Sequence, residues 1–177
     1  MTMRIDNRWA GFLRDQTGTA TIEFTIIFPF LMYMILSIAE AGSLMARAVM
    51  LDRGVEIAMR DLRLGRVPGI THQEIKDRIC DAAFLIGECR GAIQLEMAPL
   101  PNAASFPGSE ITCIDRTSEI EPVVMFDPGA RSEIMLVRAC VVVDPIFPGI
   151  GLGALLPTDA SGGVALTAMS AFMNEPG

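Results

Sequence analysis

Uncharged, mostly apolar residues follow one another from Phe24 to Ala39, at the centre of the only segment of the chain long enough to cross a membrane. As an α-helix this run is about 24 Å long at ~1.5 Å per residue, which falls short of a hydrocarbon core of roughly 30 Å. A helix that begins at Thr19 spans about 32 Å and places Glu23 at or within the membrane boundary. An acid inside a membrane costs on the order of 2.5–3.5 kcal/mol, so Glu23 is a candidate functional residue.

This N-terminal pattern fits three kinds of segment. The first is a single-pass membrane anchor whose Glu23 side chain reaches the headgroups. The second is a secretory signal peptide with an A-x-A-like cleavage site at residues 39–41, although the apolar run is longer than usual. The third is a leader cut between Gly18 and Thr19, which keeps the apolar helix and makes Glu23 the fifth residue of the mature chain. The residues alone leave all three open.

Beyond the apolar run, a narrow apolar seam predicts that the helix continues. Its residues recur at steps of three and four: Leu44, Ala48, Leu51, Val55, Ala58 and Leu62. Gly65 and Pro68 end it. We expect the seam to pack on the protein's own sheet, with its membrane-proximal half also open to a helix of another molecule. Pro29, inside the apolar run, predicts a kink or local melting, which membrane helices tolerate.

A second helix is predicted from Thr71, because Glu74 follows it three residues later and completes a capping box. Its buried stripe is Ile75, Ile79, Ala82, Ala83 and Ile86. Gly87 ends the helix. His72, the only histidine, falls in the first turn and is expected to be a surface residue.

From Gly91 onward, alternation with a period of two predicts strands. The candidates are Ile93–Met97, Glu110–Ile114, Val123–Phe126, Ser132–Val143 and Val164–Phe172. The valine run 141–143 predicts a central strand that is buried on both faces. Two helices followed by an antiparallel sheet make the predicted fold class α+β.

An irregular but apolar stretch, from Ile146 to Leu156, separates the last two predicted strands. We expect it to fold back over one face of the sheet. The alternative is an exposed patch that contacts a partner.

Four cysteines stand at positions 80, 89, 113 and 140, with spacings that match no zinc motif. They allow three disulfide pairings, and buried free thiols are the alternative. Cys80 with Cys89 is the most economical pair, because it closes the second helix onto the next strand. Cys113 with Cys140 would then join two strands.

Composition supports an exported, membrane-tethered protein. The 177 residues suffice for one domain with a modest core, and the mean hydropathy of +0.42 reflects in part the apolar helix. The net charge of −7 and the lack of a basic face disfavour nucleic-acid binding. No nucleophile, metal or phosphate-loop motif is present, so we expect no enzyme activity, no cofactor and no small-molecule substrate. The basic residues Arg4, Arg8 and Arg14 predict a cytoplasmic N-terminus.

Both ends of the chain resemble one family. Gly18-Thr-Ala-Thr-Ile-Glu23-Phe24, with Pro29 after it, is similar to the prepilin-type processing site at the start of TadE-like proteins. Residues 169–176, Met-Ser-Ala-Phe-Met-Asn-Glu-Pro, resemble the A-F-x-N-E-P ending common in that family. TadE-like proteins are minor pilins or pseudopilins of tight-adherence (Flp, type IVc) pili. The middle of the chain is matched only loosely.

This resemblance implies a set of partners and roles. A prepilin peptidase of the bacterial inner membrane would remove residues 1–18 by cutting between Gly18 and Thr19. Glu23 would pair with the new ammonium of a neighbouring subunit's Thr19, with Phe24 beside it. Pro29 would let packed subunits slide or curve within a filament. The remaining partners would be other pilin and pseudopilin subunits.

The sequence therefore predicts four parts. Residues 1–18 are a cytoplasmic leader, 19–40 a transmembrane helix, 41–66 its periplasmic extension, and 67–177 a pilin-like periplasmic α+β domain. The predicted function is a minor pilin-like subunit needed to assemble a tight-adherence pilus or a related secretion apparatus. The alternative is a single-pass envelope protein whose acidic periplasmic domain binds a partner unrelated to pili.

Overall fold

The structure is a computed structural model that describes residues 18–64, 66, 71–100, 111–117, 124–130 and 132–174. Its elements in chain order are α2 Thr19–Arg63, α3 His72–Ala82, α4 Cys89–Ala92, β1 Ile93–Leu100, β2 Ile134–Val143, the short 3-10 helix η2 Gly151–Ala154 and β3 Val164–Met173. Two main helices and a three-stranded antiparallel sheet give the predicted α+β class.

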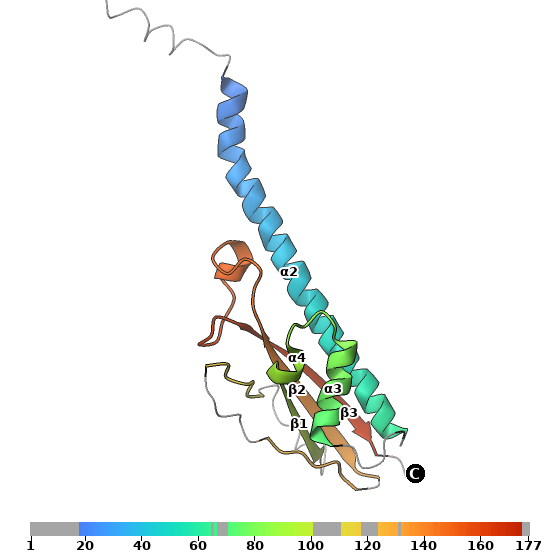
Figure 1. Ribbon diagram of the computed structural model, residues 1–177. Coiled ribbons are helices and arrows are strands. Elements are labelled where there is room, and N and C mark those ends of the chain that lie inside the picture. The colour runs from blue at the N-terminus through green and yellow to red at the C-terminus, as the bar shows by residue number, and fades with distance from the viewer. Residues whose placement is uncertain are drawn as a thin grey trace, which may run out of the picture.

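The helix α2 is a single rod of 45 residues that joins two different environments. Its C-terminal half lies against the folded domain, while its N-terminal half extends beyond it (Figure 1). The helix begins at Thr19 and ends at Arg63, close to the predicted boundaries; Gly65 and Pro68 lie outside the described residues. The helix is continuous through Pro29, so of the two predicted effects local melting does not occur, and the kink stays a prediction.

The sheet has the strand order β1-β2-β3, with both pairs antiparallel. Val141 of the central strand β2 pairs with Ile93 on one side and Leu166 on the other. The valine run 141–143 is buried, which confirms its predicted central place.

Two further predicted strands are not formed by their described residues. Residues 111–115 form no strand, and Phe126 makes a single parallel bridge with Met97. The disulfide of Cys113 holds residues 111–117 against Cys140 of β2. Residues 111–117 therefore lie against the central strand, whereas an additional strand would have to pair with an edge strand of the sheet. Glu110 and Val123 lie outside the described residues.

The core lies between one sheet face and the two main helices. It contains Leu51, Val55, Ile75, Ile79, Ile93, Leu95, Met135 and Val137. Close contact between the helices depends on Gly54, since a Cβ there would lie 2.6 Å from the carbonyl oxygen of Ile79. The predicted seam of α2 therefore packs within its own domain, and its line of buried residues starts one turn earlier than expected, at Glu40.

The α3 region follows the prediction at its start and departs from it at its end. Thr71 and Glu74 form the capping box. The helix ends at Ala82 rather than Gly87, because the chain turns there and reaches α4, whose Cys89 bonds to Cys80. His72 lies at the surface but is partly buried: its Nε2 lies 2.9 Å from the Leu95 carbonyl oxygen, and its ring packs 5.0 Å from that of Phe126.

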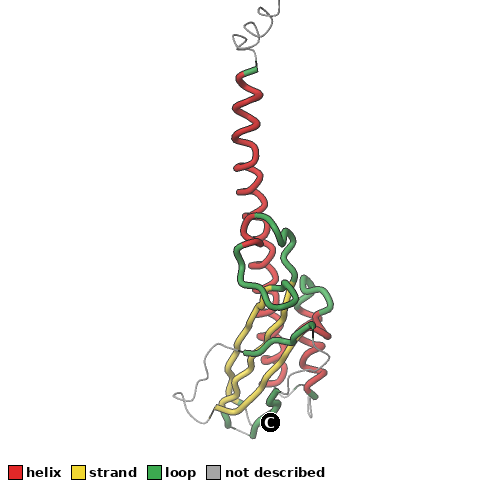
Figure 2. The backbone as a smooth tube through the Cα atoms, turned by 90° about the vertical axis from the view of Figure 1, so that its left-hand side faces the viewer, coloured by secondary structure: helices red, strands yellow, loops and turns green. Residues whose placement is uncertain are grey.

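The apolar connection between β2 and β3 does not cover a sheet face, so that prediction is wrong. Residues 146–156, which we call the docked loop, lie beside α2 at Ser37 and Glu40. Figure 2 shows the loop next to the helix, beyond the end of the sheet from which the projecting half of α2 extends. The reason is polar: Glu40 offers the loop two hydrogen-bond acceptors that the sheet face does not.

Candidate functional site

The predicted processing site lies at the exposed start of α2. Gly18 precedes the helix, and its carbonyl oxygen accepts bonds from the amides of Thr21 (3.1 Å) and Ile22 (3.2 Å). A Cβ added to Gly18 would meet no atom within 4 Å, so the backbone is open to an approaching molecule. Thr19 is the first helical residue.

The predicted assembly residues lie on the same exposed part of the helix. Glu23, Phe24 and Pro29 all face the surroundings, and the Phe24 ring packs 5.1 Å from the ring of Phe28. No residue from Thr19 to Ala39 is buried. Among the described residues, α2 is the one helix long and apolar enough to span a membrane; an 18-residue window in it has a mean hydropathy of 2.0.

A second acid on α2, Glu40, has the opposite environment and was missed by sequence reasoning. Its side chain is fully buried. Its Oε1 accepts the Ile146 amide at 3.1 Å and its Oε2 accepts the Phe147 amide at 2.7 Å. Burying a carboxylate is costly unless its oxygens are hydrogen-bonded, and both oxygens are bonded here.

Arg47, two turns further along α2, holds the neighbouring backbone. Its Nη1 donates to the Asp144 carbonyl oxygen at 2.8 Å. Residues seven apart lie on the same face of a helix, so Glu40 and Arg47 reach the chain together where it leaves β2. We call this pair the helix clamp. A signal was present in the sequence, because Glu40 extends the seam of Leu44 and Leu51 by one turn.

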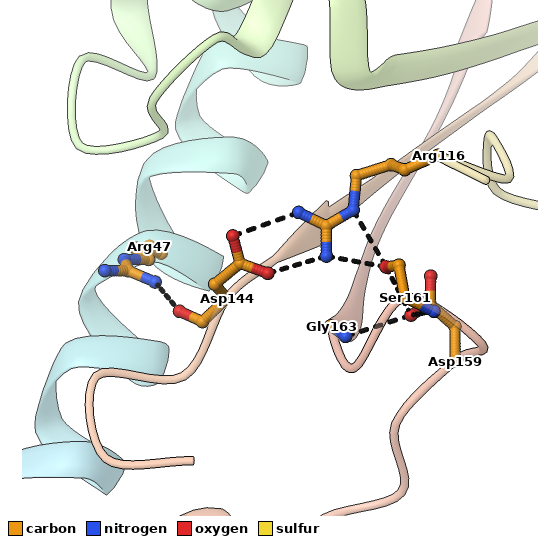
Figure 3. A network of polar contacts seen from close by, with 6 residues as sticks. All are labelled: Arg47, Arg116, Asp144, Asp159, Ser161 and Gly163. Atoms are coloured by element: carbon orange, nitrogen blue, oxygen red, sulfur yellow. Dashed lines mark hydrogen bonds and ion pairs between the residues drawn. The ribbon is translucent and has the colours of Figure 1, made fainter.

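A polar latch closes the base of the 144–163 connection on the other side (Figure 3). Arg116 donates to both carboxylate oxygens of Asp144, at 3.1 and 2.6 Å, and to Ser161 Oγ from Nε and Nη2, at 3.0 and 2.7 Å. Asp159 Oδ1 accepts the Ser161 hydroxyl and the amides of Ser161 and Gly163. The latch therefore joins the two ends of the connection through a third segment.

The latch changes the ionisation of its acids. Hydrogen bonding and charge from Arg116 hold the pKa of Asp144 below its usual range, against a smaller effect of burial. At Asp159, burial alone would raise the pKa, but the bonds from Ser161 and Gly163 together lower it. The same pairing with Asp144 raises the pKa of Arg116. The latch is thus built for the ionised form of both carboxyl groups.

The four cysteines form two disulfides, Cys80–Cys89 and Cys113–Cys140. These are the pairs that the spacing favoured, with one correction. Cys113 lies in a segment without strand structure, so its bond joins a loop to β2 rather than two strands. The bond fixes residues 111–117 over β2 and thereby positions Arg116 for the latch.

A cavity of about 280 Å³ lies between the helix clamp and the latch. Arg47 and Arg116 line it together with Glu88 and Asp144. Within the described residues, no three histidine, cysteine or acidic side chains gather in a way that could hold a metal ion. The two arginines at the cavity are already engaged with protein groups, since Arg47 and Arg116 both bond to Asp144.

Comparisons with known proteins identify one segment. Residues 18–60 match the family model of the TadE-like protein. No curated protein and no solved structure matches the chain. The match starts at Gly18 and runs along α2 through both the projecting half and the helix clamp. Over this helix, the chain is similar to TadE-like proteins.

Proposed function

We propose that the protein is a minor pilin-like subunit needed to assemble a tight-adherence pilus or a related secretion apparatus. The observation that carries this proposal is the family match at residues 18–60, which begins at the predicted cleavage point and includes the whole apolar run. The exposed, apolar half of α2 gives the match a physical meaning. Such a surface needs a lipid or protein environment, and the TadE-like match connects it to pilus assembly.

In this proposal a prepilin peptidase of the bacterial inner membrane removes residues 1–18. The helix begins directly after Gly18, and the glycine has open space around it, which supports access for a protease. Residues 19–39 then remain as the membrane span, with the domain on the periplasmic side; this span is one residue shorter than the sequence predicted, because Glu40 is buried against the docked loop. The proposed role is assembly, without catalysis.

The proposed task of Glu23 is to pair with the Thr19 ammonium of a neighbouring pilin or pseudopilin subunit. Its carboxylate is exposed one turn into the helix, on the half that the protein's own domain leaves uncovered. In an apolar environment such a pair offsets part of the cost of burying either charge. A misplaced subunit would leave the acid unpaired, so the pair would set the register of assembly.

The test is intact-mass measurement of the protein extracted from membranes, together with piliation of the cells. We expect a chain that begins at Thr19, and only the uncleaved form for Gly18→Arg. Glu23→Ala is expected to be cleaved but to support no pili. Glu56→Ala, an exposed acid on the other half of α2, is the matched control and should leave piliation normal. A chain that begins at Met1, or normal piliation with Glu23→Ala, would contradict the proposal.

A further inference from the structure

We propose that the docked loop, residues 146–156, inserts its exposed apolar side chains into the outer leaflet of the membrane that α2 crosses. The inference rests on the proposed function, because it assumes that residues 19–39 span a membrane. It adds a second membrane contact, made by a part of the chain that lies more than a hundred residues after Glu40 in sequence and outside the segment matched by the family model.

The composition of the loop suits a lipid surface. The fourteen residues from Pro145 to Thr158 contain no charged side chain. Ile146, Ile150 and Leu155 are exposed, Leu155 to 74%. Exposed apolar residues that gather in one loop are uncommon on a soluble surface and mark a contact with a partner or a membrane.

The position of the loop favours the membrane as the partner of its exposed apolar side chains. A Cβ added to Gly151 would lie 2.6 Å from Ser37 Oγ, so the loop backbone touches α2 at Ser37, inside the apolar run. A span of about 20 residues that starts at Thr19 ends near Ile38. The loop contact is therefore level with the last turn of the span, and the exposed loop side chains lie where the membrane surface meets the helix.

The helix clamp explains how polar backbone can be held at this level. Lipid offers no partner for free amide groups, so a loop at a membrane boundary needs protein acceptors. Glu40 accepts the amides of Ile146 and Phe147, and each bond also satisfies one oxygen of the buried carboxylate. The charged latch stands at the base of the same connection, where its two ends meet. The connection is thus apolar at the membrane level and charged toward the domain, the distribution found in interfacial membrane elements.

A helix of a neighbouring subunit is the competing occupant of this patch. The membrane is favoured because the exposed loop residues continue the exposed apolar surface of α2 at the same level. In the proposed topology lipid surrounds that level as soon as one chain is inserted. A protein partner would require a second chain.

The experiment measures quenching of single tryptophans by brominated lipids in the full-length chain. Trp9, the only tryptophan, is replaced by phenylalanine in every variant. The loop reporter is Ile150→Trp, and Met173→Trp at the far end of β3 is its control, since the two positions are 53% and 55% exposed. Phe30→Trp reports on the span itself. The vesicles contain phosphatidylethanolamine and phosphatidylglycerol with bromine on the acyl chains, at about one protein per vesicle.

We expect Phe30→Trp and Ile150→Trp to be quenched severalfold more strongly than Met173→Trp. Leu155→Trp is a second loop reporter, in case a tryptophan beside Gly151 disturbs the loop, and should be quenched like Ile150→Trp. Quenching of Phe30→Trp without quenching at either loop position would overturn the loop insertion and leave the span intact. An unquenched Phe30→Trp would instead contradict the span, and with it the proposed function. Loop fluorescence that responds only to a higher protein density would assign the patch to another subunit and overturn the inference.

Discussion

The two halves of α2 belong to one continuous helix but bury very different amounts of surface. From Thr19 to Ala39 no residue is buried, although the half is strongly apolar. From Glu40 to Arg63 the apolar seam is covered by α3, the sheet and the docked loop. The first half therefore depends on an environment outside the chain, while the second half is completed within it.

The two acids of the helix show the same contrast. Glu23 is exposed in the apolar half, and Glu40 is buried in the half that the domain covers. A buried acid with two amide donors needs no external partner. An exposed acid in an apolar segment is costly until a membrane surface or another subunit receives it. Glu40 therefore has a structural task within the domain, and Glu23 is the acid for which an assembly role is proposed.

The largest expected difference between the two halves of α2 comes from replacing a leucine by alanine once in each half. Leu51→Ala removes a completely buried side chain and should lower the free energy of unfolding by about 2–5 kcal/mol, through lost burial and the cavity left behind. Leu31→Ala, in the exposed half, should change it by no more than about 0.5 kcal/mol. Guanidinium unfolding of the full chain in detergent micelles, followed by circular dichroism, measures both. Equal losses would mean that the exposed half packs on the domain.

The acids give the next test. Glu40→Ala leaves the amides of Ile146 and Phe147 without their acceptor, which should cost about 1–3 kcal/mol. Hydrogen exchange at these two amides should accelerate together with that loss. Glu23→Ala is the control and should leave both the unfolding free energy and the loop amides unchanged. Unaltered exchange in Glu40→Ala would show that the docked loop is held by other contacts.

A smaller effect is expected from the contact between the docked loop and the helix. Gly151 has a φ of +64°, and an added Cβ would collide with Ser37 Oγ, which already donates to the Tyr33 carbonyl oxygen. Gly151→Ala should therefore cost about 1–2 kcal/mol, from the left-handed backbone alone. Gly149→Ala has open space and no such backbone, and should be neutral. Exchange mass spectrometry of residues 146–156 separates the two variants.

Local sequence signals predicted the elements well, because each depends on nearby residues. The capping box of Thr71 and Glu74, the start of α2 at Thr19 and the central strand with its valine run all follow from spacings of a few residues. The same signals also predicted short strands, such as 123–126, whose described residues form no more than a single bridge. A few apolar residues do not determine which strand a segment pairs with.

Such local signals could not predict the helix clamp or the latch. Glu40 and Phe147 are 107 residues apart, and Arg116 and Asp144 are 28 apart. Each pairing exists only after the 144–163 connection has docked, so no local period encodes it. The sequence placed Glu40 at the edge of the apolar run, and only the folded loop shows that the acid is satisfied.

Acid should open the latch before it affects the helix. Because Arg116 lowers the pKa of Asp144 in the folded chain, the pair stabilises the fold above the ordinary aspartate pKa of about 4, and this contribution is lost as the pH falls further. Asp159 behaves in the same direction. The size should stay below about 1 kcal/mol, since Asp144 is largely exposed to solvent.

A measurement of global unfolding would combine the effect of the latch with that of other acids, such as Glu74 and Asp115, whose pKa values are also lowered. Hydrogen exchange at the Ser161 and Gly163 amides reports on the latch alone, because both amides donate to Asp159. These amides should lose protection below about pH 4, while those of the central strand β2 keep theirs. Arg116→Gln should abolish most of this pH dependence by removing the partner of Asp144. If both sets of amides lost protection together, the connection and the sheet would open as one unit, and the docked loop would be as stable as the half of α2 on which it lies.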